Sequence, residues 1–209
     1  MTDPVRREYA RLAPVYDKKW AFYNEATIRA TLSGLEVGGT ERVLDAGCGT
    51  GNLILALRDK WPRLECVGLD LSAEMLSVAG AKLARGAGRP PLVQGRAERL
   101  PFADGAFDLV ISCNALHFVP APARALSEFR RVLRAGGRLL VTDWCDDYIS
   151  CRLCSLLLRL FGREHGHLLG CREFAALLGG AGFAAEAVHA FKINWLWGLM
   201  TARASAGRR

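Results

Sequence analysis

Segment 43–52 holds the residues whose types and spacing point most directly to chemistry. It reads VLDAGCGTGN and joins an apolar run, the carboxylate of Asp45 and three alternating glycines. Because glycine lacks a Cβ, such a loop can turn sharply from a strand into a helix and bring its backbone close to a ligand. The spacing is G-x-G-x-G rather than the dinucleotide fingerprint G-x-G-x-x-G, and Asp45 would repel a pyrophosphate at the helix N-terminus. The segment therefore predicts a nucleotide-type pocket that suits a cationic ligand.

A second carboxylate, Asp70, follows the apolar run 64–69 about twenty residues after the glycines. An acidic residue at this place in a βαβ unit commonly accepts hydrogen bonds from ribose hydroxyls. Each charge-assisted bond of this kind contributes about 1.5–3 kcal/mol before losses elsewhere. Asp45 and Asp70 together thus favour a nucleoside ligand with a ribose and without phosphates.

Five motifs extend this pattern along most of the chain. They are VLDAGCGTGN at 43–52, VGLDLSAEML at 67–76, GRAERLPFADGAFDLVIS at 95–112, NALHFV at 114–119 and EFRRVLRAGGRLLVTD at 128–143. Together they resemble the class I S-adenosylmethionine-dependent methyltransferases, in particular the small enzymes grouped with ubiquinone and menaquinone biosynthesis. The resemblance implies an α/β fold with a Rossmann-like, seven-stranded, mostly parallel sheet, helices on both faces and an antiparallel last strand. It also implies S-adenosyl-L-methionine as cofactor and S-adenosyl-L-homocysteine as product.

The elements that must position these residues follow from short apolar runs that alternate with helical patterns, which indicates βα units. Ser72 should cap the second helix, and the Ala-Gly-Gly at 135–137 should separate the third from its strand. Two later runs, 183–191 and 193–204, suggest an antiparallel pair and would be strands six and seven by resemblance. The earlier strands are expected at 41–46, 65–69, 91–95, 107–112 and 137–143, and the helices at 51–60, 73–85, 121–134 and 172–180.

With 209 residues and 51% hydrophobic content, the chain is sized for a single methyltransferase domain over 1–209. Its first part, 1–34, is helical in pattern and rich in aromatic residues, and we expect it to act as a cap. In the resembling family the segment matching 9–17 folds over cofactor and substrate, so Tyr16 is a candidate catalytic residue. The alternative is that these aromatic side chains only pack on the sheet.

The resemblance assigns the cofactor's parts to particular residues. Gly47, Gly49 and Gly51 would line the methionine moiety, Asp45 would organise its amino group, and Asp70 would take the ribose. Leu71 and Met75 would flank the adenine. The remaining expected cofactor contacts are Cys48, Asn52, Ala97, Glu98, Asn114 and Leu116.

The adenine end departs from the family at Arg96, where an acidic residue is usual. An arginine has only donors and so cannot accept a hydrogen bond from the adenine amino group. Glu98 or a backbone carbonyl would then take that role, and Ala97 would contribute through its backbone. The alternative is that Arg96 and Glu98 form an ordinary surface pair at a strand end.

His117 is the candidate general base, because it follows the fourth strand at the carboxyl edge of the sheet and imidazole titrates near neutral pH. The alternative is that it only holds its loop by hydrogen bonding. The turn reads Asn-Ala-Leu-His from Asn114. It lacks the two prolines that follow the Asn or Asp in enzymes that methylate nucleobase amines, which favours a small-molecule acceptor.

Segment 144–170 is the most individual part of the chain, and we expect it to form a lid that shapes an apolar acceptor pocket. It contains Cys145, Cys151, Cys154, His165 and His167. Thiolates and imidazole could bind a soft metal or arsenite. The helical spacing of Cys151 and Cys154 instead favours small residues on a buried face, and no metal site is expected.

Composition limits the partners. The net charge of +7 is scattered over helical patterns without interleaved aromatic residues, so no nucleic-acid binding is expected. The N-terminus lacks a signal-peptide core and no apolar run reaches the length of a membrane span, so we expect a cytoplasmic protein without stable membrane insertion.

The leading hypothesis is therefore an S-adenosylmethionine-dependent methyltransferase with a small, hydrophobic acceptor. A non-catalytic protein that binds the same cofactor is the alternative from another class, and Arg96 adds weight to it. A nicotinamide oxidoreductase and an arsenite methyltransferase are further alternatives.

Overall fold

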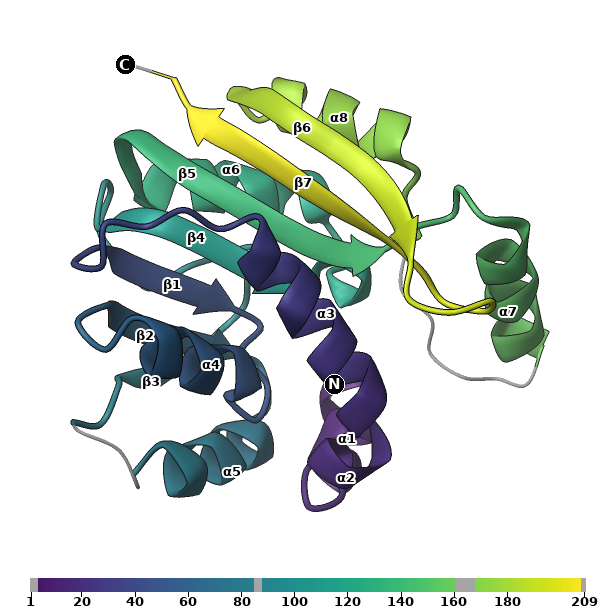
Figure 1. Ribbon diagram of the computed structural model, residues 1–209, viewed down its shortest axis with the longest axis horizontal. Helices are drawn as coiled ribbons and strands as arrows, with labels where there is room; N and C mark the ends of the chain where they lie inside the picture. The colour runs from purple at the N-terminus through teal and green to yellow at the C-terminus, as the bar shows by residue number, and fades with distance from the viewer. Residues whose placement is uncertain (1–3, 85–87, 161–167, 208–209) are drawn as a thin grey trace.

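The computed structural model describes residues 4–84, 88–160 and 168–207. Within them, seven strands form one sheet in the order β3-β2-β1-β4-β5-β7-β6 (Figure 1). Strands β1 to β5 are parallel, and β7 runs antiparallel between β5 and β6. The predicted fold, with its inserted antiparallel last strand, is confirmed. The strands are β1 Arg42–Ala46, β2 Glu65–Asp70, β3 Leu92–Gln94, β4 Phe107–Cys113, β5 Leu133–Trp144, β6 Phe183–Lys192 and β7 Gly198–Ala206.

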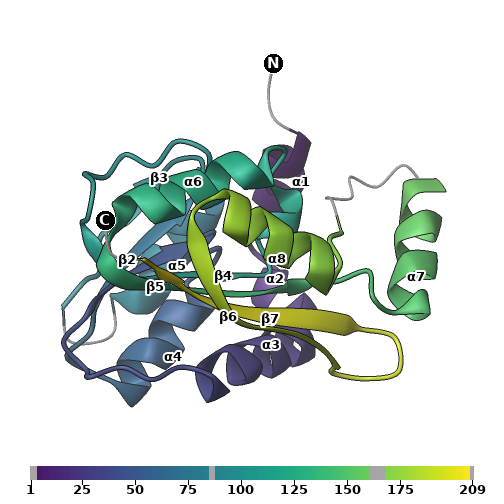
Figure 2. The same cartoon turned by 90° about the horizontal axis from the view of Figure 1, so that it is seen from above.

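Helices cover both faces of this sheet (Figure 2). Helices α6 and α8 pack on one face, while α3, α4 and α5 pack on the other. The helices are α1 Pro4–Leu12, α2 Tyr16–Lys19, α3 Ala21–Ser33, α4 Asn52–Lys60, α5 Ala73–Leu83, α6 Pro122–Val132, α7 Ile149–Leu160 and α8 Cys171–Gly180, with a 3-10 turn, η1, at Leu116–Phe118.

The central strands are apolar on both sides because each side meets a helical layer. Along β1, Val43 belongs to the core under α4, and its neighbour Leu44 belongs to the core under α6 and α8. Leu109 and Val110 of β4 alternate in the same way. This two-sided burial fixes the strands and so fixes the loops at their carboxyl ends.

Three boundaries differ from the sequence prediction. The cap is divided into α1, α2 and α3, and Pro14 lies at the first break, where it has no amide hydrogen to continue a helix. Helix α6 ends at Val132 and β5 already begins at Leu133, with Gly136 at φ 72° and a shift of register against β4. Strand β7 begins at Gly198, since residues 193–197 form a turn in which Asn194 Oδ1 accepts bonds from the Leu196 and Trp197 amides at 2.9 and 2.7 Å.

Helix α7 stands at the far end of the molecule, away from the helical layers (Figures 1 and 2). It is joined to the turn between β6 and β7, where the amide of Gly198 donates to Cys151 Sγ at 3.1 Å. In the described residues no helix is long and apolar enough to cross a bilayer.

Candidate functional site

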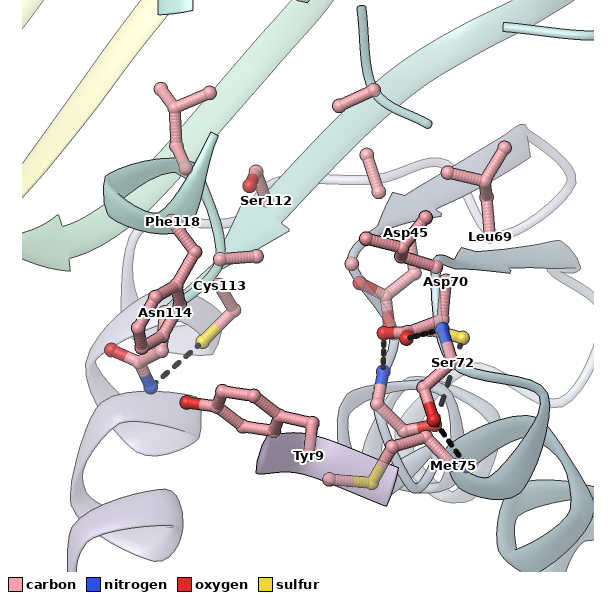
Figure 3. A pocket seen from close by; sticks show the side chains of 18 of the residues that line it. Tyr9, Asp45, Leu69, Asp70, Ser72, Met75, Ser112, Cys113, Asn114 and Phe118 are labelled. Atoms are coloured by element: carbon pink, nitrogen blue, oxygen red, sulfur yellow. Dashed lines mark hydrogen bonds between the residues drawn. The ribbon is translucent and has the colours of Figure 1, made fainter. Parts of the chain in front are cut away.

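A cavity opens at the carboxyl ends of β1, β2 and β4, under the cap helices α1 to α3. Figure 3 shows Asp45, Asp70 and Met75 on one side of it, Cys113, Asn114 and Phe118 on the other, and Tyr9 between the two groups. The cavity brings together the site residues expected from the sequence, apart from Gly51 and His117. Tyr9, Arg6, Ser72, Cys113 and Phe118 line it as well and were not among the expected ligands.

Asp45 is the most unusual group in the cavity. Its side chain is 1% exposed, and neither carboxylate oxygen has a hydrogen-bond partner. Burial, and secondarily the charge of Asp70, raise the pKa of Asp45 to about 8. A buried carboxylate without a partner is unfavourable, so the site is arranged for a group that donates hydrogen bonds and carries positive charge.

Asp70 is held differently, although it ends the neighbouring strand. Its Oδ2 accepts the amide of Gly49 at 2.8 Å, and its Oδ1 accepts the amide of Ser72 at 2.9 Å. Burial still raises the pKa of Asp70, against the opposing effect of these amides. Each carboxylate oxygen has a second lone pair, so Asp70 can accept further bonds from a ligand. The two contacts also connect the glycine loop to the start of α5, where Ser72 caps the helix through the Met75 amide at 3.2 Å.

The three glycines of the loop, Gly47, Gly49 and Gly51, contribute to the structure in different ways. A Cβ on Gly47 would lie 2.3 Å from the Cβ of Ala115, and its φ of +90° is one that L side chains rarely adopt. Gly51 does not line the cavity; it precedes α4, and a Cβ there would lie 3.0 Å from Leu83 and 3.2 Å from Ala79. Gly51 therefore allows α4 to pack on α5, while Gly47 and Gly49 form the cavity wall.

A polar cluster fastens the cap to the glycine loop. Asp17 of α2 accepts bonds from Thr50 Oγ1 at 2.6 Å and from Asn52 Nδ2 at 2.9 Å, and it pairs with Lys82 Nζ at 2.6 Å. Lys82 Nζ also donates to Asn52 Oδ1. The side chain of Asn52, an expected cofactor ligand, is thus engaged with the cap. We call the cluster of Asp17, Thr50, Asn52 and Lys82 the cap latch.

Asn114 makes a second connection to the cap. It is the one non-glycine residue with positive φ, 55°, in the described part of the chain. Its Oδ1 accepts the hydroxyl of Tyr23 at 2.8 Å, and its Nδ2 donates to Thr27 Oγ1 at 2.9 Å. Its left-handed conformation follows β4, and its side-chain amide is directed to α3. Asn114 therefore lines the cavity while it holds the cap in place.

His117 lies beside the cavity and does not line it. Its amide donates to Asp143 Oδ2 at 3.0 Å, and its Nδ1 is hydrogen bonded to Asp143 Oδ1. The ring lies 3.9 Å from the ring of Phe118 and stacks on Trp144 at 5.8 Å, between centroids. The buried carboxylate of Asp143 thus fixes the η1 turn, which places Leu116 and Phe118 in the cavity wall.

The part of the cavity under the cap is aromatic. The ring of Tyr9 lies 5.1 Å from that of Phe118 and 6.0 Å from that of Tyr16. Burial raises the pKa of both tyrosines, so their hydroxyls keep their protons at neutral pH. This region can receive an apolar or aromatic group and offer it hydroxyl donors.

The opposite part of the cavity is lined by Leu71, Met75, Arg96, Ala97 and Glu98. The Glu98 backbone carbonyl accepts a bond from Arg124 Nε at 3.1 Å. Its carboxylate remains an acceptor, whereas Arg96 supplies only donors. The five residues therefore form a wall that combines apolar side chains with charged ones.

The sequence matches known methyltransferases. A family described as "Methyltransferase domain" matches residues 44–141. A ubiquinone/menaquinone biosynthesis C-methyltransferase, UbiE, of Syntrophotalea carbinolica is 39% identical over 67% of this chain and 61% of that protein. A malonyl-[acyl-carrier protein] O-methyltransferase of Laribacter hongkongensis is 36% identical over 70% of this chain and 52% of that protein. The chain thus matches only about half to three fifths of these relatives' lengths.

Solved structures agree on the fold. A chain in the complex between the Haloferax volcanii Trm112 methyltransferase activator and the putative methyltransferase superposes with a TM-score of 0.84 at 20% identity, over 96% of this chain and 98% of that chain. This chain belongs to the class I S-adenosylmethionine-dependent methyltransferases. The cofactor of this family is S-adenosylmethionine.

The residues of this cavity fit that cofactor. Asp45 lines the cavity, and neither of its carboxylate oxygens has a hydrogen-bond partner. The cofactor of the family carries an ammonium and a sulfonium, which match such a carboxylate in charge. Gly47 has a positive φ, and a Cβ at this position would collide with Ala115. The loop therefore has room for backbone atoms but not for a side chain at Gly47. Two carboxylates in one cavity are also poorly suited to a phosphate-bearing ligand.

Residues 161–167 of segment 144–170 lie outside the described part of the chain. The described residues of the segment do not line the cavity, and its role as a lid stays a prediction. Cys145 and Cys151 are buried, whereas His165 and His167 lie outside the described residues. Among the residues that the structure describes, no group of three His, Cys, Asp or Glu side chains is arranged to hold a metal ion.

Proposed function

We propose that this methyltransferase transfers a methyl group from S-adenosylmethionine to a small, largely apolar acceptor that lies under the cap. The observation that carries the proposal is the pair of carboxylates, unpartnered Asp45 and amide-bound Asp70, in a cavity that continues to an aromatic end. The names of the two relatives fit the proposal in part, since one methylates carbon and the other oxygen.

The cofactor would be held along the carboxyl edge of the sheet. Asp45 would accept hydrogen bonds from its ammonium, with Gly47, Cys48 and Gly49 around the methionine moiety. Asp70 would accept the ribose hydroxyls with the lone pairs that Gly49 and Ser72 leave open. Leu71, Met75, Ala97 and Glu98 line the cavity and would surround the adenine, and Leu116 would lie near the glycine loop.

When bound, the cofactor supplies a methyl group on a positively charged sulfur, which is a good leaving group. The residues of the chain then have to orient the acceptor and exclude water. Tyr9 and Phe118 would hold the acceptor by ring contacts, and Tyr16 would orient it through its protonated hydroxyl. His117 lies outside the lining, so we assign it to the support of η1 and not to proton transfer.

Two measurements test the proposal in sequence. Calorimetry with S-adenosylhomocysteine and NAD should show binding of the first alone; tight NAD binding without the first would end the proposal. Asp70→Ala should weaken S-adenosylhomocysteine binding about tenfold or more, at least ~1.4 kcal/mol. Unchanged affinity would show that Asp70 is not the ribose ligand.

The acceptor is identified by transfer of a labelled methyl group to a panel of quinols, phenols, lipids and arsenite. Tyr16→Phe keeps the ring and removes the hydroxyl, so it should lower transfer to the true acceptor while S-adenosylhomocysteine affinity stays within about threefold. Val15→Ala, an exposed neighbour, is the matched control. Cofactor binding without transfer to any acceptor would favour a non-catalytic cofactor-binding protein.

A further inference from the structure

Helix α7 presents its apolar side chains to solvent. The exposed fractions are 81% for Ile149, 55% for Leu153, 55% for Leu156 and 45% for Leu157. These residues follow i, i+4, i+7 and i+8 spacing, so they form one continuous stripe along the helix. In a globular protein such a stripe normally faces the core, whereas in α7 it faces solvent.

A small residue in the first turn of α7 packs on the protein. Cys151 is 2% exposed, and Gly198 leaves so little room that a Cβ there would lie 2.1 Å from Tyr148 and 3.0 Å from Cys151 Sγ. The helix is therefore tightly joined at its first turn, through Cys151, to the turn between β6 and β7. The outward direction of the leucines follows from this packing.

The turn that supports α7 adds an exposed tryptophan. Trp195 is 80% exposed, and Lys192 Nζ lies 3.4 Å from its backbone carbonyl and 4.9 Å from the centre of the Tyr148 ring. Tryptophan is enriched where a protein surface meets the headgroup region of a bilayer. Figure 1 shows α7 and this turn together at one end of the molecule.

Charge at this end favours an anionic partner. The α7 sequence ISCRLCSLLLRL has two arginines and no acidic residue, and the whole chain carries +7. Nearby Asp146 pairs with Arg152, whose Nε lies 4.0 Å away, and Asp147 accepts the Cys171 amide at 2.9 Å. The positive charge that is not offset by Asp146 comes from Lys192 of the supporting turn and from Arg159 in the α7 sequence. A helix with an apolar stripe and basic but no acidic residues in its sequence is typical of helices that lie in a membrane interface.

We propose that α7 and the Trp195 turn form a docking surface for an anionic lipid bilayer, with the leucine stripe inserted at the level of the headgroups. This surface is separate from the cofactor cavity, which α7 does not line in the described residues. The proposal thus goes beyond the proposed methyl transfer and does not depend on it.

The test is co-sedimentation of the full chain with vesicles of phosphatidylcholine alone or mixed with phosphatidylglycerol. We expect binding to the mixed vesicles, a blue shift of tryptophan emission that Trp195→Phe removes, and loss of binding at high salt. Leu153→Gln should weaken binding about tenfold, because it removes one buried leucine from the bilayer. Leu55→Gln, at a 38% exposed leucine of α4, should leave binding unchanged.

S-adenosylhomocysteine affinity is measured for each variant and should stay unchanged, which shows that the fold is kept. Absence of vesicle binding, equal binding to neutral vesicles, or equal loss with Leu55→Gln would overturn the proposal. A wild-type dimer that Leu153→Gln converts to a monomer, without vesicle binding, would instead assign the stripe to a second copy of the chain and would also overturn it.

Discussion

Asp45→Asn should stabilise the ligand-free protein at neutral pH while it removes the strongest attraction for the cofactor. The carboxyl of Asp45 has a pKa of about 8 in the folded protein and 3.8 as its ordinary value. An acid whose pKa is raised by folding keeps its proton in the folded state when the unfolded chain has already lost it. The free energy of unfolding therefore falls as pH rises from 4 to 8, and it levels off above 8.

The magnitude follows from that interval. Between pH 3.8 and pH 7 the free energy of unfolding of the wild-type protein falls by at most about 4 kcal/mol, at about 1.36 kcal/mol per pH unit. Water that enters the cavity reduces this, so we expect a gain of about 1–3 kcal/mol for Asp45→Asn at pH 7 relative to pH 4. The comparison at pH 4, where both side chains are neutral, removes the effect of the amide itself.

Urea unfolding of wild type and Asp45→Asn at several values between pH 4 and 8 measures the difference. Asp70→Asn is the control, because Asp70 accepts two backbone amides that an asparagine cannot both satisfy, and it should gain less than Asp45→Asn. Asp45→Asn should also bind S-adenosylhomocysteine about tenfold more weakly. A stability difference that stays constant between pH 4 and 8 would refute the reasoning.

Three further outcomes test the site. Asp17→Asn should weaken S-adenosylhomocysteine binding about threefold to tenfold by opening the cap latch, whereas Glu25→Gln, which breaks an exposed pair in the same cap, should not. Gly47→Ala should lower the unfolding free energy by about 2 kcal/mol or more by denaturant titration, and Gly49→Ala, with nothing within 4 Å, by about 1 kcal/mol. His117→Gln should cost about 1–3 kcal/mol and leave cofactor affinity within about threefold; lost affinity with intact stability would contradict its supporting role.

The sheet could be predicted because its signals are local. The buried runs around Val43 and Leu109 and the glycine loop each lie within a few residues, and parallel strands place their carboxyl ends at one edge. The carboxylates at the ends of β1 and β2 thus had to meet. The start of β7 was less accessible, because the Asn194 turn interrupts an apolar run that reads as strand.

The contacts that close the site join distant residues, and no local pattern pairs them. Asp17 and Lys82 belong to different helices, and Tyr23 reaches Asn114 across the cavity edge. The sequence also left the direction of His117 open, because that direction depends on Asp143 at the end of the neighbouring strand. The periodicity of α7 shows that its leucines share a face, but not that the face is uncovered.

These features connect stability with binding. Burial raises the pKa of the Asp45 carboxyl, and the cap that is fastened at Asp17 and Asn114 lies over the same cavity. We expect this cap to keep water away from Asp45. A cationic ligand would stabilise the ionised carboxylate of Asp45. Above the pKa that Asp45 has in the ligand-free protein, the carboxylate is already ionised and attracts the ligand. Below that pKa, Asp45 must first release a proton for the ligand to bind. Ligand affinity should then rise with pH toward about 8. Opening the cap latch should make ligand affinity depend less on pH, because an Asp45 that is exposed to water is already ionised at neutral pH.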